Sequence, residues 1–311
     1  MAYYTKINKE EFKKYLSNYN LNNLFNFKGI NEGIENTNYF FKTKTRKYIL
    51  TIYENRITER IKKKNLFFFI QLINFLIKNK FPCPKILFNK NNKQLSSYKN
   101  KKYAIIDFVE GKIAKKINIK QCFMLGKAVA KLHLIAKKFN KKRQNDFSLN
   151  DWEKLIKKIK LSKSQSIFLK KEIKYLKKEW PKKLPKGIIH GDLFPDNVFF
   201  KKNKIVGIID LSNACYDFFS YDIAICINAW CYEKKLNVNK MKNLIKGYNS
   251  IRKIKIEELN YLNLFLRASS LRFYLSRLMD SQNKKIPKKY KKNPKEYLKK
   301  LKFFQSKEFI N

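Results

Sequence analysis

Residues 187–210 constrain the fold more than any other part of the sequence. Two apolar, strand-like stretches flank the polar run HGDLFPDN. A polar run held between two buried β-strands is a loop on a rigid scaffold, which is where proteins place catalytic groups. The loop contains Asp192 and Asn197, five residues apart, and Asp210 follows thirteen residues later at the end of the second strand.

These three side chains have the chemistry of a phosphoryl transferase. A carboxylate can accept a hydroxyl proton, while an amide oxygen and a second carboxylate can hold a magnesium ion. A purely structural interpretation also exists, in which Asp192 and Asn197 form a turn that Asp210 caps. A single aspartate would fit either interpretation, but the whole spaced string favours the catalytic one.

Residues 25–110 have the pattern of a small antiparallel sheet. Short apolar runs occur at residues 39–41, 48–53 and 103–108, with turn-like polar clusters between them. Residues 66–77 are long and apolar enough for a buried helix, which Pro82 and Pro84 then end.

Helical periodicity dominates from residue 119 onward, for example over residues 123–136 and 259–279. We therefore expect an α+β, two-lobe fold. Residues 1–110 would form a small lobe with a sheet and one helix, and residues 111–311 a larger, mainly helical lobe.

The formal net charge of +47 raises the question of nucleic-acid or membrane binding. Eight of the 71 basic residues are arginine, so 63 are lysine, and they are scattered along the chain with abundant Asn, Ile and Phe. A/T-rich codons specify all of these residues, whereas nucleic-acid readers favour arginine. We expect a solvated surface and no specific nucleic-acid partner, although weak, salt-sensitive polyanion binding stays open.

Targeting signals and cysteine pairs are not evident. The first residues are charged from Lys6 onward, and the longest apolar runs are shorter than the ~20 residues of a spanning helix. The five cysteines form neither a CxxC pair nor a zinc-like cluster. We expect a cytoplasmic protein that does not enter a membrane.

The string His190-Gly191-Asp192, with Asn197 five residues after the aspartate and an Ile-Asp pair at Asp210, resembles the motifs of aminoglycoside-phosphotransferase-like kinases. These enzymes are relatives of protein kinases. The resemblance implies a protein-kinase-like fold that uses ATP and Mg²⁺. It also implies that Asp192 is the catalytic base, that Asn197 and Asp210 are the metal ligands, and that His190 supports the loop.

Two further residues take structural roles by the same resemblance. Asp222 resembles the family aspartate that anchors the catalytic loop, and His133 lies in a familiar helix ending in Leu-His, where we expect it to be packed rather than catalytic.

The similarity extends to the homoserine kinases of this type and covers nearly the whole chain. It implies transfer of the γ-phosphoryl group of ATP to the side-chain hydroxyl of L-homoserine, a step toward threonine. Kinases of the same fold that act on choline, ethanolamine, an aminoglycoside or a thiosugar remain alternatives, as does a basic polyanion-binding protein with a degenerate kinase core. Intact Asp192, Asn197 and Asp210 argue against the last. The matching segments are residues 33–40, 48–54, 224–231, 271–278 and 293–298.

Phosphate binding is expected at the polar turn of Asn36, Thr37 and Asn38, although Gly33 is the only glycine beside it. Protein kinases place a phosphate-contacting lysine on the third strand. Thr51 occupies that place here, and Lys47 is about 13 Å farther along the strand. We expect Thr51 at the nucleotide, as in homoserine kinases of this type.

The hinge is expected at residues 107–111, where backbone groups would accept adenine, with Asp107, Phe108 and Val109 as the cofactor-binding residues. Three arginines recur on a later helical segment in a chain that otherwise uses lysine. Such arginines can bind the carboxylate of a substrate or pair with acidic residues to hold the lobe together, and we favour the pairing. The arginines are Arg267, Arg272 and Arg277, and the expected partners are Asp217, Asp222 and Asp280.

Overall fold

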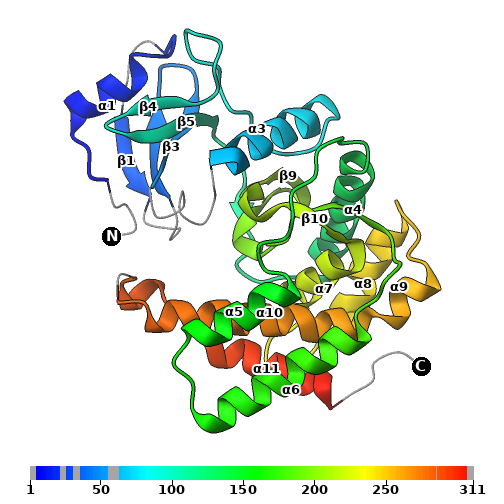
Figure 1. Ribbon diagram of the computed structural model, residues 1–311. Coiled ribbons are helices and arrows are strands. Elements are labelled where there is room, and N and C mark those ends of the chain that lie inside the picture. The colour runs from blue at the N-terminus through cyan, green and yellow to red at the C-terminus, as the bar shows by residue number, and fades with distance from the viewer. Residues whose placement is uncertain (1–4, 22–25, 31–35, 55–62, 285, 307–311) are drawn as a thin grey trace. The chain divides into compact units, whose positions relative to one another are not determined.

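The computed structural model describes residues 5–21, 26–30, 36–54, 63–284 and 286–306. The chain divides into two compact units (Figure 1). The first comprises Met1–Gly111 with Val206–Ile209, and the second comprises Lys112–Ile205 with Asp210–Asn311. Residues 206–209 therefore belong to the first unit, although we expected everything after residue 110 to belong to the second. That the two units are a nucleotide-binding and a catalytic lobe stays a prediction.

The first unit contains a five-stranded antiparallel sheet with the strand order β1-β2-β3-β5-β4 (Figure 1). The three apolar runs expected to be strands lie in β2, β3 and β5, so that prediction is confirmed. The strands are β1 (Asn26–Ile30), β2 (Thr37–Lys42), β3 (Lys47–Tyr53), β4 (Ser96–Tyr98) and β5 (Lys101–Asp107).

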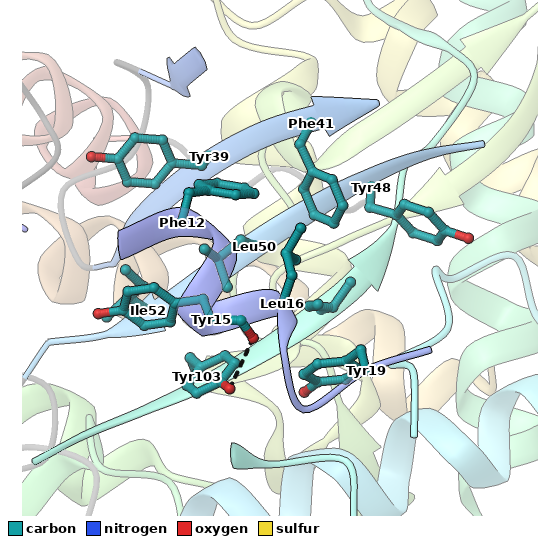
Figure 2. Packing of buried hydrophobic residues seen from close by; sticks show 11 residues of the cluster. Phe12, Tyr15, Leu16, Tyr19, Tyr39, Phe41, Tyr48, Leu50, Ile52 and Tyr103 are labelled. Carbon is teal, nitrogen blue, oxygen red and sulfur yellow. Dashed lines mark hydrogen bonds between the residues drawn. The ribbon is translucent and has the colours of Figure 1, made fainter. Parts of the chain in front are cut away.

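Helix α1 (Lys9–Leu16), which the sequence pattern did not predict, covers one face of this sheet. The Asn8 side chain caps the helix by accepting from the Glu11 N–H. Figure 2 shows its apolar side chains against those of β2, β3 and β5, with the Tyr103 hydroxyl donating to the Tyr15 carbonyl at 3.0 Å. The cluster contains Phe12, Tyr15, Leu16, Tyr19, Tyr39, Phe41, Tyr48, Leu50, Ile52, Tyr103 and Ile105.

Helix α3 (Lys63–Lys78) confirms the buried helix expected at residues 66–77. Ile70 of α3 packs with Ile86 and with Ala104 of β5 in a second, smaller core. The helix ends where Lys80 adopts a left-handed conformation, φ 55°, just before Pro82.

The second unit is mainly helical, as expected. The long helix α10 contacts α5, α6, α7, α9 and α11 and is buried along most of its length. Residues 259–279 do not form one helix, because the chain turns at Tyr261 (φ −94°, ψ 2°) and divides the stretch into α9 and α10. The helices are α4 (Ile119–Ala136), α5 (Leu149–Lys158), α6 (Lys163–Glu179), α7 (Phe219–Trp230), α8 (Val238–Asn249), α9 (Ile256–Asn260), α10 (Leu262–Gln282) and α11 (Pro294–Gln305).

Short strands frame the polar loop predicted from the sequence. One sheet pairs β10 with β7, and the other has the order β6-β8-β9. Three 3-10 helices, η1 (Pro195–Asn197), η2 (Leu211–Asn213) and η3 (Lys288–Tyr290), lie in the connections. The strands are β6 (Lys112–Ile113), β7 (Lys186–Ile189), β8 (Val198–Lys201), β9 (Lys204–Ile208) and β10 (Cys215–Phe218). In the described residues, no helix has the length and apolar character to cross a membrane.

Helices α4 and α8 approach each other closely at two glycines. A Cβ on Gly126 would lie 2.0 Å from the carbonyl oxygen of Leu244, and one on Gly247 would lie 2.0 Å from that of Phe123. Both obstacles are backbone atoms, which cannot move aside as a flexible side chain can. Glycine is therefore required at this crossing.

Gly126→Ala should lower the free energy of unfolding by about 1 to 3 kcal/mol, because overpacking outweighs the higher helix propensity of alanine. Urea denaturation followed by circular dichroism measures this change. Lys131→Ala, on an exposed position of the same helix, is the control and should change stability by less than about 0.5 kcal/mol. A Gly126→Ala protein as stable as the parent would contradict the close crossing.

Candidate active site

The polar loop after β7 is anchored by Asp222, a fully buried residue on α7. Its carboxylate accepts the N–H groups of His190, at 3.0 Å, and Gly191, at 2.9 Å. Burial acts to raise the pKa of Asp222, but hydrogen bonds from His133 and Gly191 outweigh it, so the pKa lies below its usual value. The expected loop-anchoring role of Asp222 is confirmed.

His133 completes the support of this carboxylate. Its Nε2 lies 3.1 Å from Asp222 Oδ2, its Nδ1 lies 2.8 Å from the Tyr248 hydroxyl, and its ring stacks on Phe219. Burial lowers the pKa of His133, so the ring is neutral; since a carboxylate only accepts, Nε2 carries the proton and Nδ1 accepts from Tyr248. His133 is fully buried and packed, as expected.

The loop is held at three more places. The buried His190 accepts the Asp192 N–H at its Nδ1, 3.3 Å away, which agrees with the expected supporting role. The Arg272 guanidinium donates to the Gly191 carbonyl and the Trp230 indole N–H to the Leu193 carbonyl. Gly191 is left-handed, φ 74°, and a Cβ there would lie 2.9 Å from the Asn213 carbonyl oxygen, so glycine is required.

Asp192 presents a partly exposed carboxylate at the start of this anchored loop. Its Oδ2 accepts from the Asn213 side-chain amide at 3.2 Å. Burial raises the pKa of Asp192 to about 6, with Arg272 opposing this effect and the charge of Asp210 adding to it. The carboxylate is therefore ionised at neutral pH and able to accept a proton.

Asn197 and Asp210 each keep one oxygen open. The Asn197 Nδ2 donates to the Asp192 carbonyl at 2.8 Å, which turns its Oδ1 the other way. Asp210 is left-handed (φ 60°, ψ 59°), and its Oδ1 accepts from the Ser212 hydroxyl. Neither Asn197 Oδ1 nor Asp210 Oδ2 has a hydrogen-bond partner among the described residues.

One amide oxygen and one carboxylate oxygen fit Mg²⁺, which is commonly bound through one or two carboxylates, substrate phosphates and waters. These two oxygens alone do not complete the coordination of the ion, so phosphate oxygens and waters would supply the remaining ligands. Among the described residues, no group of three or more His, Cys, Asp or Glu side chains is arranged to hold a metal ion.

Asn213 and Ser212 were not identified from the sequence. They contact Asp192 and Asp210 from η2, directly after the second carboxylate. Their position in the run LSN after Asp210 is the only signal that the sequence offers.

The expected phosphate-binding turn is partly strand. Thr37 and Asn38 belong to β2, because their backbones pair with Ile52 and Thr51 of β3. The Thr37 hydroxyl is fully buried and donates to Glu54 at 2.5 Å. Gly33 lies outside the described residues.

The polar side chains near the start of β2 and on β3 differ in their hydrogen-bond and ion-pair partners. Thr51 donates to Asn38 Oδ1 at 2.8 Å, whereas Asn36 Oδ1 is buried without a partner. Lys47 pairs with Glu110 at 2.8 Å.

The hinge segment follows β5 directly. The Asp107 N–H donates to the Lys85 carbonyl and the Phe108 N–H to the Lys47 carbonyl. In the described part of the chain, the carbonyl of Asp107 and the N–H of Val109 have no hydrogen-bond partner. One acceptor and one donor, two residues apart, are thus open in the first unit.

The three arginines of α10 do not pair with the expected aspartates. Arg267 forms a bidentate pair with Glu172, and Arg277 bonds to Glu296. Arg272 donates to the Gly191 carbonyl, and the rings of Phe147 and Phe273 lie against its guanidinium. The expected pairing with acidic residues is correct for Arg267 and Arg277, but the partners are Glu172 of α6 and Glu296 of α11 rather than the aspartates.

A model of the phosphotransferase enzyme family matches residues 26–249. The homoserine kinase of Bartonella henselae is 41% identical over 287 residues, covering 90% of this chain and 89% of the relative. That of Agrobacterium fabrum is 40% identical, covering 90% and 88%, and that of Nitrobacter winogradskyi is 39% identical, covering 91% and 88%.

Solved structures share the fold at much lower identity. An amicoumacin kinase in complex with AMP-PNP and Ca²⁺ matches with a TM-score of 0.76 and 15% identity, covering 97% of this chain and 92% of that one. A choline kinase from Streptococcus pneumoniae matches with a TM-score of 0.71 and 15% identity, covering 96% and 99%. The α+β, protein-kinase-like architecture is therefore confirmed. By its sequence over nine-tenths of its length, the chain belongs to the homoserine kinases of the phosphotransferase enzyme family.

Proposed function

We propose that the chain transfers the γ-phosphoryl group of ATP to the side-chain hydroxyl of L-homoserine, forming O-phospho-L-homoserine for threonine synthesis. The observation that carries this proposal is its similarity, at about 40% identity over 90% of the chain, to several curated homoserine kinases. The choline and aminopropanol kinases of the same fold are 15% and 13% identical. That likeness supports the fold and not their substrates.

Asp192 is the catalytic residue of this proposal. Its ionised carboxylate accepts the hydroxyl proton and orients the oxygen for attack on the γ-phosphorus. The Asn213 amide holds one carboxylate oxygen, while Asp222 fixes the loop that carries it. A loose transition state needs the nucleophile oriented more than fully deprotonated, so the rigidity of the loop contributes to the rate.

Asn197 and Asp210 would hold Mg²⁺ through the two oxygens described above. When bound, Mg²⁺ neutralises charge on the phosphate oxygens of ATP. The hydrogen bond from Asn197 Nδ2 to the Asp192 carbonyl keeps the amide oxygen in place before the metal arrives. The Ser212 hydroxyl does the same for Asp210.

In the first unit, the Asp107 carbonyl and the Val109 N–H recognise adenine, which needs one acceptor for its amino group and one donor for a ring nitrogen. Phe108, whose ring packs against Phe40, fixes the backbone between them. The side-chain amides of Asn36 and Asn38 contact the phosphates, and Thr51 positions Asn38 by donating to its Oδ1. Thr37 does not take part through its hydroxyl, which is buried against Glu54. We also propose a cytoplasmic location, since ATP is available there and the cysteines are free.

Homoserine should be the preferred acceptor in a panel incubated with ATP and Mg²⁺ and followed by ADP release. L-serine should have a kcat/KM at least about tenfold lower, because its hydroxyl lies one methylene closer to the backbone. Choline, ethanolamine and an aminoglycoside serve as the other members of the panel. Turnover of choline without turnover of homoserine would refute the proposed function.

Asp192→Asn should lower turnover by roughly a hundred- to ten-thousand-fold, the usual contribution of a positioned acid–base group. The affinity for ATP should change little, because the substitution keeps the size of the side chain and removes only the proton acceptor. Single-turnover phosphoryl transfer measures the first quantity, and a separate ATP titration is the control. Turnover within about threefold of the parent would mean that Asp192 only shapes the loop.

A further inference from the structure

A cavity of about 340 Å³ lies in the second unit, beside the catalytic loop. Phe194 and Pro195, which follow Asp192 by two and three residues, form one wall. Arg277 of α10 and Glu296 of α11 form another. The volume is at the lower end of the ~300 to 1,000 Å³ of small-molecule sites and is ample for a four-carbon amino acid.

Arg277 presents unused hydrogen-bond donors in this cavity. Its side chain is 9% exposed, and Nη1 makes its hydrogen bonds, to Glu296 at 2.6 Å and to the Asn293 carbonyl at 3.2 Å. Within the described residues, its Nε and Nη2 have no hydrogen-bond partner. The guanidinium stacks on the Tyr297 ring at 4.4 Å, which fixes the plane of the open edge.

Arg267, three turns earlier on the same helix, shows what the open edge of Arg277 can bind. There the Nε and Nη2 atoms form a bidentate pair with Glu172, at 2.9 and 2.7 Å. A guanidinium edge with these two donors matches the two oxygens of a carboxylate. At Arg277 the same two donors have no protein carboxylate among the described residues, and the residue lines a cavity.

The charges around Arg277 also favour an anion. Glu296 is shared, since it accepts from Arg277 at 2.6 Å and from Lys300 at 2.7 Å. Two buried cations thus share one carboxylate, and Lys292 is a further cation in the cavity wall, paired with Asp196 at 3.6 Å. A buried charge without full compensation is costly, and a ligand carboxylate would supply the missing negative charge.

The cavity is lined by the residues that directly follow the Asp192 segment in the loop. The Phe194 N–H donates to the Asp192 carbonyl at 2.9 Å, and the Phe194 ring packs on Phe273 and Tyr297. An extended homoserine places its carboxylate carbon about 5 Å from its hydroxyl oxygen.

We propose that Arg277 binds the α-carboxylate of the acceptor amino acid in this cavity and thereby selects amino acids over simple amino alcohols. This inference rests on the proposed homoserine kinase activity. The substrate hydroxyl lies at Asp192 while its carboxylate occupies the open edge of the guanidinium. Arg277 is thus a specificity-determining residue, and Glu296 keeps it in position.

The test compares homoserine with 3-aminopropan-1-ol, which is homoserine without its carboxylate. In the parent, kcat/KM for homoserine should exceed that for the amino alcohol by about a hundredfold, the scale of a lost buried charge pair. In Arg277→Gln this ratio should fall below about tenfold. Homoserine loses the contact of its carboxylate with the guanidinium, whereas the amino alcohol has no carboxylate to make it. The KM for ATP should stay unchanged.

Arg267→Lys is the matched control, since it alters a buried arginine pair on the same helix away from the cavity. It should lower the melting temperature but leave the substrate ratio as in the parent. Arg277→Lys retains a cation beside Glu296 but lacks the two parallel donors of the guanidinium. It tests the inference if the glutamine variant does not fold. In the lysine variant the ratio of kcat/KM for homoserine to that for the amino alcohol should be at least about tenfold lower than in the parent.

A retained ratio in the Arg277 variants, or an equal loss on both substrates, would overturn the inference and leave Arg277 a structural residue. A parent enzyme that does not phosphorylate homoserine would instead refute the proposed function. The two failures are therefore distinct.

Discussion

The candidate site depends on one buried carboxylate. Asp222 accepts two consecutive backbone N–H groups, from His190 and Gly191, at the point where β7 ends and the loop begins. Hydrogen bonds to a charged group contribute about 1.5 to 3 kcal/mol each. His133, neutral and fixed by Tyr248, keeps the carboxylate ionised inside the second unit. The backbone of the loop is set by this arrangement before any ligand binds.

Every proposed role in the second unit follows from that fixed backbone. Asp192 comes directly after the anchored pair, and its carbonyl then orients the Asn197 amide. Arg272 supports the loop from α10, and Arg277 lies on the same helix beside the cavity. Helix α10 therefore contributes both to the rigidity of the catalytic loop and to the proposed recognition of the substrate carboxylate.

The sequence predicted those parts whose signal is local. Alternating apolar runs identified β2, β3 and β5, and the spacing of Asp192, Asn197 and Asp210 identified the loop. The partners of the arginines could not be predicted, because Glu172 lies 95 residues from Arg267 and only the packing of α6 brings them together. Thr37 likewise looked like a turn residue, whereas strand pairing and Glu54 bury its hydroxyl. The open edge of Arg277 is visible only when its neighbours are known.

We propose that Asp222 gives the catalytic loop its geometry without touching the substrate. Asp222→Asn turns one acceptor oxygen into an N–H donor that faces a backbone N–H. The most direct measurement is single-turnover homoserine phosphorylation by this variant, with its ATP affinity and with hydrogen exchange of residues 190–192. If Asp222 fixes the loop, the variant should lose at least about a hundredfold in turnover. Hydrogen exchange of residues 190–192 should be faster, and the ATP affinity should change little. Turnover within about threefold of the parent, with unchanged exchange, would contradict this role of Asp222.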